Sequence, residues 1–253
     1  MSAPSDAPSG RTAAAIQIGF VLVVLAGWAF AANYRLVSVF FLPNPADVLD
    51  ALIETIASGE MWRHLRVTLT ELAIAFSLNS VLATVVGFLV TRSLNSTIVF
   101  EPIFAALFSI PIILFYPINV LIFGIGMESK IVQGALFGFF PIVLHTIAGF
   151  SSVNPTLIRF ARVTGASQRQ ILTRILMPAA MPVLVGGYRI GFILTFLSII
   201  SAETITSLEG LGNRIVWHAE ILQTAEMFAF IVVIIALAFL MNIALRMLEE
   251  RWK

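Results

Sequence analysis

The sequence has no cysteine and very little charge. Without cysteine the chain can form no disulfide and no thiolate metal site, and it has no cysteine nucleophile. Only 11% of its 253 residues are charged and 59% are hydrophobic, whereas ordinary soluble domains carry about 25% charged residues. A soluble fold of this size could not cover its surface with so few polar side chains. We therefore expect lipid to solvate most of the chain.

Other absences narrow the function further. The formal net charge is +1, so nucleic acid is not an expected partner. The histidines, His64, His145 and His218, lie far apart in sequence and have no metal-ligand spacing. The chain also lacks the G-x-x-x-x-G-K-[ST] loop that holds ATP phosphates. We therefore expect no metal, cofactor or ATP site in this chain.

Several apolar segments are long enough to cross about 30 Å of hydrocarbon, which takes roughly 20 helical residues. The predicted spans are residues 13–33, 66–91, 98–123, 129–150, 183–204 and 226–246. The predicted fold class is an all-α membrane protein with six transmembrane helices in a single domain, residues 13–253, after a tail of residues 1–12. The AFAAN stretch in the first segment resembles a signal-peptide cleavage site, but the long apolar core favours a retained span.

Basic residues predict the orientation, because Lys and Arg concentrate in cytoplasmic loops. With a cytoplasmic N-terminus, the inside segments hold Arg11, Arg92, Arg159, Arg162, Arg169, Arg174, Arg246, Arg251 and Lys253. The outside segments then hold Arg35, Arg63, Arg66, Lys130 and Arg214. The inside excess predicts that both termini are cytoplasmic.

The segment after the first span predicts a short amphipathic helix. Asn44 is a suitable N-cap and Pro45 suits the first helical turn. The apolar residues that share one face are Leu49, Leu52, Ile53 and Ile56. We expect this helix to lie on the outer membrane surface or to pack on the bundle.

The loop between the fourth and fifth spans predicts two short helices joined at a glycine. Asn154 and Pro155 are typical of a helix start, and Gly165 suits the left-handed position that ends a helix. Ser167 and Gln170 then form a capping-box pattern that starts a second helix. Two prolines further on, at residues 178 and 182, are expected to bend the chain before the fifth span.

The first helix of this loop combines basic and apolar residues. Arg159 and Arg162 lie three residues apart, among Leu157, Phe160 and Val163. The arginines could contact anionic lipid headgroups, or the helix could dock into a cleft of a cytoplasmic protein. These residues alone favour neither alternative.

The loop resembles the EAA loop of inner-membrane permeases of binding-protein-dependent ABC importers. That pattern reads roughly E-A-A-x-x-x-G, then nine residues, then I-x-L-P. Here Arg159, Phe160 and Ala161 occupy the E-A-A positions, Gly165 is the glycine, and residues 175–178 read ILMP. Arg159 reverses the charge expected of the pattern, and Phe160 replaces a small residue.

Further blocks extend the resemblance over most of the chain. They read FLPNPADVLDAL, SIPIILFYPINVLIFGIGMESKI, FFPIVLHTIAGF, GGYRIG and EGLGNRI. They are similar to the branch that imports taurine, alkanesulfonates, nitrate, cyanate, pyrimidine vitamin precursors and aromatic carboxylates. Glu71 departs from this branch, which commonly has a basic residue there.

The resemblance implies the type I importer fold, with a cytoplasmic coupling helix in the loop of residues 151–182. It implies a non-catalytic permease of the bacterial inner membrane that pairs with a second permease, identical or different. Two cytoplasmic ATPases would bind ATP and magnesium, and a substrate-binding protein would dock outside. The implied ATPase-coupling residues are Leu157, Arg159, Phe160, Ala161, Arg162, Gly165, Ala166 and Ser167.

Polar groups and prolines inside the spans are candidates for the translocation path. Pro111 and Pro117 each remove a backbone hydrogen bond, and such breaks are tolerated where a cavity or polar neighbours meet the freed groups. A packed structural kink is an equal alternative. The candidate path residues are Ser109, Pro111, Tyr116, Asn119, His145, Arg189 and Glu203. Of these, Arg189 suggests an anionic solute, His145 also fits a simple packing role, and Glu203 could help to close the outer end.

Two other classes of function compete with an importer permease. A stand-alone secondary transporter or channel would need coupling carboxylates near the midplane or inverted repeats, whereas the acids here lie mostly near span ends. Glu71 is one of these, and it could reach headgroups or pair with a basic side chain. An intramembrane hydrolase would need a serine paired with His145, and no serine has a recognisable nucleophile setting.

Overall fold

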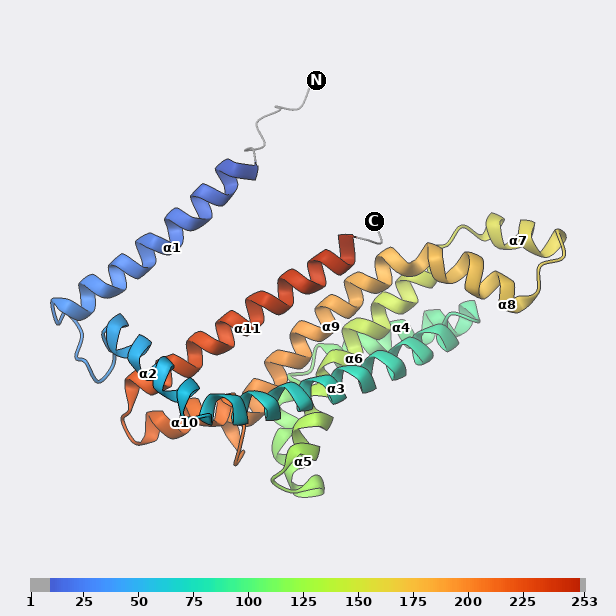
Figure 1. Ribbon diagram of the computed structural model, residues 1–253. Helices are drawn as coiled ribbons and strands as arrows, with labels where there is room; N and C mark the ends of the chain where they lie inside the picture. Colours follow the sequence, from blue (N-terminus) through green and yellow to red (C-terminus); the bar gives the residue numbers. More distant parts are fainter. Residues whose placement is uncertain (1–9, 251–253) are drawn as a thin grey trace.

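The computed structural model describes residues 10–250, and within them it contains helices and no strands (Figure 1). The elements are α1 (Gly10–Asn33), α2 (Pro45–Ala57), α3 (Glu60–Val90), α4 (Leu94–Phe108), the 3₁₀ turn η1 (Ile112–Phe115), α5 (Tyr116–Phe123), α6 (Met127–Ser151), α7 (Pro155–Val163), α8 (Gln168–Ile171), the π-turn η2 (Leu172–Leu176), α9 (Met177–Ile205), α10 (Leu211–Glu220) and α11 (Thr224–Glu250). The first nine residues of the predicted tail lie outside this range.

Five helical segments of the described chain are long and apolar enough to cross a membrane, and a sixth is broken. The five lie in α1, α3, α6, the run from α8 through α9, and α11. In the sixth, α4 and the segment Ile112–Phe123 meet at an angle of 77°. The break falls at Pro111, which has no backbone N–H to continue the helix of α4.

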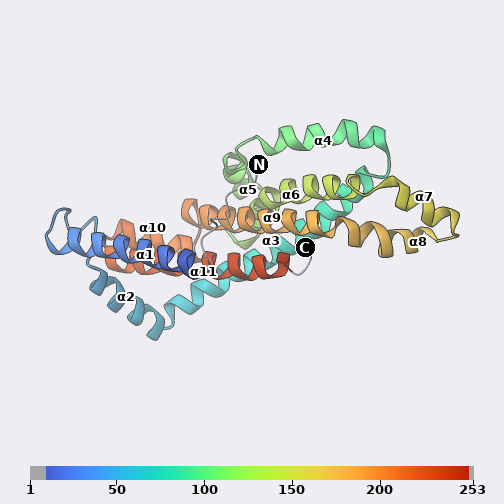
Figure 2. The ribbon, with the colours of Figure 1, turned by 90° about the horizontal axis from the view of Figure 1, so that it is seen from above.

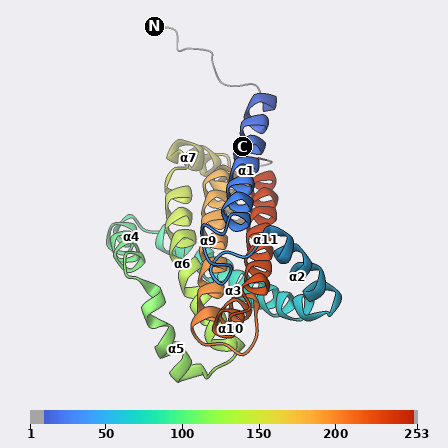
Figure 3. The same ribbon diagram turned by 90° about the vertical axis from the view of Figure 1, so that its left-hand side faces the viewer.

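The centre of the bundle is α6, which packs against α3 and α9 (Figures 2 and 3). Small residues allow this close approach. A Cβ atom at Gly138 would collide with the side chains of Asn79 and Thr195 and would lie 2.8 Å from the carbonyl oxygen of Gly191. Glycine at this position therefore lets α6 and α9 meet almost backbone to backbone, with the Asn79 side chain of α3 packed against them.

The first helix stands apart from the bundle (Figure 1), and most of its apolar side chains are exposed. Its contacts concentrate near its C-terminal end. There Trp28 donates from Nε1 to the Pro43 carbonyl at 3.0 Å, and its ring lies 5.7 Å from that of Phe228. The length and apolar surface of α1 suit a helix surrounded by lipid.

The amphipathic helix predicted after the first span is α2, and its N-terminus is capped by Asn44 as expected. The residues it buries are Val48, Ala51 and Thr55. Of the predicted apolar stripe, Leu49, Ile53 and Ile56 are exposed, whereas Leu52 is partly buried against a core cluster that includes Phe230 of α11. The helix packs against α11, which is one of the two alternatives expected for it.

The bend predicted before the fifth span is present, but the helix does not end there: α8 and α9 follow different directions within one continuous run (Figure 1). Residues Gln168–Ile205 form one helical run of 38 residues, with Pro178 in the first turn of α9 and Pro182 inside it. The π-turn η2 immediately precedes them. A π-turn re-registers the backbone hydrogen bonds, and π-turns and prolines are common sites of helix bends, so the helix changes direction here without ending.

Candidate functional site

Local capping builds the α7–α8 hairpin at one end of the molecule (Figure 1). Asn154 accepts a hydrogen bond from the backbone N–H of Thr156 at 2.9 Å, which starts α7. Ser167 accepts from the backbone N–H of Gln170 at 3.3 Å, and the Gln170 side chain accepts from the Ser167 N–H at 2.8 Å. This reciprocal pair is the capping box predicted from the sequence.

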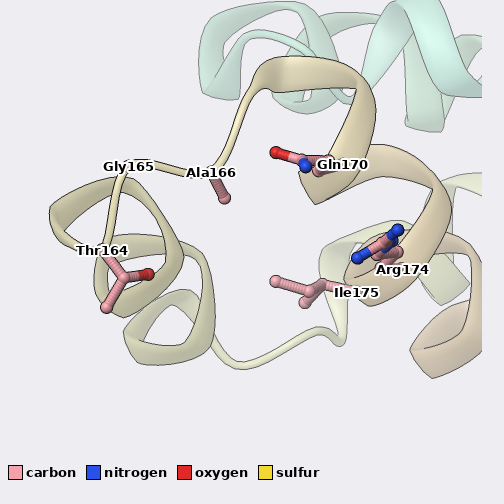
Figure 4. Close-up of a pocket in the computed structure, with 6 residues that line it drawn as sticks. All are labelled: Thr164, Gly165, Ala166, Gln170, Arg174 and Ile175. Carbon is pink, nitrogen blue, oxygen red and sulfur yellow. The ribbon is translucent and has the colours of Figure 1, made fainter.

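The turn between the two helices depends on Gly165, whose φ is +82°. Side chains disfavour this left-handed conformation because the Cβ crowds the following carbonyl oxygen. The turn leaves an open hollow of about 300 Å³ lined by Thr164, Gly165, Ala166, Gln170, Arg174 and Ile175. Figure 4 shows Gln170 and Ile175 directed into the gap between the helices.

The implied coupling residues divide into a buried and an exposed set. Ala161 is buried, on a helix that packs against α8 and η2. Phe160 and Val163 are 68% and 86% exposed, and Leu157 is 51% exposed. Such apolar exposure on a short hairpin marks a surface for a partner or for lipid.

The exposed surface of the hairpin is also basic. Arg159, Arg162, Arg169 and Arg174 are all exposed, and within residues 10–250 none of them forms an ion pair. No Asp or Glu occurs between residues 151 and 182. The hairpin therefore presents an uncompensated positive charge.

A second polar constellation lies at the opposite end of the bundle, where α3, α6 and α9 meet a loop. Glu71 on α3 forms an ion pair with Lys130 on α6, and both side chains are almost completely buried. The Lys130 ammonium also donates to Ser207 Oγ at 3.0 Å and to the Glu209 carbonyl at 3.2 Å. All three N–H donors of the ammonium thus have acceptors. Of the two alternatives for Glu71, contact with headgroups or pairing with a basic side chain, the structure shows the pairing.

Glu203 on α9 completes this constellation. It accepts from Thr68 Oγ1 at 2.7 Å and from the backbone N–H of Gly212 at 2.7 Å, and it is 1% exposed. Its carboxylate lies beside Glu71 and packs against Gly210, whose φ is +118°. Any side chain at Gly210 would displace it.

Two further residues of α3 hold the same loop. The backbone N–H of Gly210 donates to His64 Nδ1 at 3.1 Å, and that of Leu211 donates to Thr68 Oγ1 at 3.0 Å. Tyr116 donates to the Thr206 carbonyl at 2.8 Å. We call the set of Glu71, Lys130, Glu203, Thr68 and His64 the outer cluster, because the orientation predicted from the basic residues would place it on the outer side. It ties three helices and residues 206–212 into one unit.

The sequence predicts only part of the outer cluster. Glu203 is among the candidate path residues and Glu71 is a candidate for pairing with a basic side chain, whereas the sequence gives Lys130, His64 and Thr68 no role in a site. These residues lie far apart along the chain, so no spacing motif connects them. The available signal was the charge balance: a buried carboxylate requires a buried cation or donor nearby.

The candidate path residues do not form one constellation. Tyr116 and Asn119 are buried inside this chain, and Asn119 donates to Gln133 Oε1 at 2.6 Å. Ser109 and Pro111 are exposed at the break between α4 and η1. Tyr116 and Glu203 thus help to hold the α9–α10 loop. Ser109 and Pro111 are exposed and could face a cavity or a partner.

The other two candidates lie on α6 and α9. His145 Nδ1 is 2.8 Å from the Pro141 carbonyl, which fits the packing role considered for it. Arg189 pairs with Glu249 at 2.8 Å and donates to Asn242 at 3.0 Å. Because its charge is paired within the chain, Arg189 gives less support to an anionic solute than its sequence position suggested.

The fold is that of a permease subunit of type I ABC importers. Its architecture is similar to a chain of the inward-facing MetNI methionine ABC transporter, with a TM-score of 0.64 over 77% of this chain and 98% of that chain, at 23% identity. A chain of an amino acid ABC transporter solved with histidines aligns with a TM-score of 0.60, at 16% identity over 79% and 96% of the two chains.

The sequence comparisons identify the family. Residues 81–253 match the binding-protein-dependent transport system inner membrane component family, and the chain belongs to it. The taurine transport system permease protein TauC of Escherichia coli K12 is 34% identical over 93% of this chain and 88% of its own. The putative aliphatic sulfonates transport permease protein SsuC of Bacillus subtilis 168 is 29% identical over 90% and 83%. The chain is therefore a multi-pass membrane permease of an ABC transporter.

Proposed function

We propose that this chain imports a sulfonate, such as taurine or an alkanesulfonate. The observation that carries the proposal is the 34% identity to the taurine permease over nearly the whole chain, together with the likeness to aliphatic sulfonate permeases of two bacteria. A riboflavin permease of Chloroflexus aurantiacus is 28% identical, so other solutes belong in the test.

The proposed assembly has two permease subunits, two ATPases on the cytoplasmic side and a substrate-binding protein outside. ATP and magnesium would bind to the ATPases, and no cofactor would bind to this chain. The α7–α8 hairpin would contact an ATPase, because its exposed apolar residues and its basic charge suit a protein partner. Both termini would then be cytoplasmic, which agrees with the distribution of basic residues.

The path for the solute would run along the broken helix formed by α4, η1 and α5. Helix α4 buries none of its side chains within the chain, and Ser109 and Pro111 are exposed where it breaks. A surface of this kind suits the interface with the second permease. The outer cluster would keep α3, α6 and α9 moving as one body during alternating access.

Uptake of labelled taurine tests the proposal. Cells would produce this chain with the ATPase and the binding protein encoded beside it, and would be compared with cells carrying an ATPase whose phosphate-loop lysine is replaced. We expect uptake only with the active ATPase, and competition by alkanesulfonates but not by nitrate, benzoate or riboflavin. Uptake that persists without ATP hydrolysis would indicate a secondary transporter and contradict the proposal.

A further inference from the structure

We propose that the ATPase cleft that receives α7 is acidic where it faces Arg159 and Arg162. This inference rests on the proposed function, since it assumes an ATPase partner and adds the charge of its binding surface.

The hairpin follows the end of a helix that is itself long enough to cross the bilayer. Helix α9 alone, Met177–Ile205, has 29 residues, so it is about 44 Å long at 1.5 Å per residue. A bilayer with its headgroup regions is about 40–45 Å thick. Helix α8 bends away from α9, and α8 and α7 lie beyond its Met177 end (Figure 1).

Helix α7 lies beyond this end of α9. Figures 1 and 2 show α7 and α8 beyond the ends of α4, α6 and α11. Arg159 and Arg162 are on α7 itself, one turn apart. Anionic headgroups attract basic side chains mainly within about 10 Å of the surface, so the geometry favours a protein partner over lipid for these two arginines.

The exposed face of α7 is suited to insertion into a cleft. Arg159, Phe160 and Val163 project from the same side at helical spacing, and the two apolar residues are 68% and 86% exposed. Burying Phe160 and Val163 would also bury part of Arg159. A partly desolvated guanidinium requires a carboxylate or several carbonyl acceptors as a partner.

This chain cannot supply that carboxylate from its own hairpin. No Asp or Glu occurs between residues 151 and 182, and within residues 10–250 neither arginine forms an ion pair. The complementary charge must therefore come from the partner. Because Arg159 and Arg162 lie one turn apart, we expect carboxylates that can reach both guanidinium groups from one cleft.

The test uses the permease purified in nanodiscs and the ATPase encoded beside it. Affinity would be measured as a function of NaCl concentration for the wild type, for Arg159→Gln/Arg162→Gln and for Phe160→Ala. We expect the double variant to bind about 10-fold more weakly at low salt, with a flatter salt dependence, because two charged contacts are lost. Phe160→Ala should weaken binding but keep the wild-type salt dependence.

The matched control is Arg92→Gln. Arg92 is exposed just after the C-terminus of α3 and lies outside the hairpin. If lipid held the arginines, affinity would follow the fraction of phosphatidylglycerol in the nanodisc, and Arg92→Gln would act like the double variant. Thermal unfolding of each variant would show that the fold is intact.

A charge swap completes the test. ATPase binding lost in Arg159→Glu should return when an acidic residue of the ATPase cleft is replaced by lysine. Wild-type permease that retains no ATPase would contradict the proposed function itself. Retention of the ATPase with an unchanged affinity and salt dependence in the double variant would overturn only the acidic cleft.

Discussion

At the scale of single residues, the outer cluster shows how hydrogen bonds and an ion pair stabilise charged side chains inside an apolar bundle. Two carboxylates and one ammonium are buried together, and each accepts or donates hydrogen bonds or forms an ion pair. Removing one partner of a buried ion pair leaves an uncompensated charge, which is more costly than never having the pair. The cluster is therefore the place where a single substitution is expected to be most damaging.

Replacing Lys130 with methionine tests this expectation. Lys130→Met keeps the length of the side chain but leaves Glu71 without its cation. We expect a loss of roughly 3–5 kcal/mol in the free energy of unfolding, measured as a lower midpoint of thermal unfolding in detergent. The control is Arg66→Met, which removes an exposed cation of α3. Equal midpoints for the two variants would refute the role given to Lys130.

His218 on α10 gives stability a pH dependence. Burial lowers the pKa of His218, the positive charge of Arg214 lowers it further, and the hydrogen bond with Gln223 opposes the shift. Its Nε2 atom is buried and has no hydrogen-bond partner among residues 10–250. The unfolded chain therefore binds a proton more readily than the folded one, so stability is complete above the unfolded pKa of about 6.5 and falls as the pH drops below it.

We expect the unfolding temperature to fall between pH 7.5 and pH 5.5 because of this residue. His218→Gln should unfold at a lower temperature at pH 7.5 but should lose less on acidification, since glutamine does not titrate. The measurement is the midpoint of thermal unfolding at both pH values. A variant that loses as much as the wild type would show that other groups cause the pH dependence.

At the scale of elements, the hairpin is positioned by one glycine. Gly165 has a φ of +82° and nothing within 4 Å of the position of a Cβ atom, so a substitution is opposed by backbone strain and not by a clash. We expect Gly165→Val to disfavour the turn by about 1–2 kcal/mol. Asparagine tolerates left-handed backbone, so Gly165→Asn should be milder.

The consequence is functional, because the turn sets the direction of α7. Gly165→Val should reduce the substrate-stimulated ATP hydrolysis of the assembled transporter while leaving the unfolding temperature nearly unchanged. Gly165→Asn should retain most of the activity. Equal activity in both variants would mean that the docking of α7 does not require the left-handed turn.

At the scale of the whole molecule, the two ends of the bundle have different chemistry. One end carries the basic hairpin, and the other carries the outer cluster, α2 and α10. The absence of cysteine makes the orientation directly measurable. Val163→Cys and Leu208→Cys introduce single thiols at positions that are 86% and 79% exposed, at opposite ends.

A membrane-impermeant maleimide added to intact spheroplasts should label the cysteine at position 208 and not the one at position 163. Inverted vesicles should give the reverse pattern. This result follows from the positive-inside distribution of the basic residues. Labelling of position 163 in intact spheroplasts would reverse the orientation and remove the basis for an ATPase contact at the hairpin.

The sequence by itself determined the features that depend on neighbouring residues. The all-helical membrane class follows from long apolar segments and scarce charge. The start of α7 at Asn154, the left-handed Gly165 and the capping box at Ser167 follow from side chains that bond to the backbone within a few positions. Such interactions are visible in a short window of sequence because both partners lie in it.

The tertiary structure alone decided which distant residues meet and which faces are covered. It paired Glu71 with Lys130, placed Glu203 against the α9–α10 loop, and left Leu49, Ile53 and Ile56 of α2 exposed while Leu52 packs on the bundle. It also carried the run from residue 168 to 205 through two prolines as one helix. Sequence periodicity cannot determine these outcomes, because each depends on the packing of helices that are distant in the chain and on the need to satisfy buried charge.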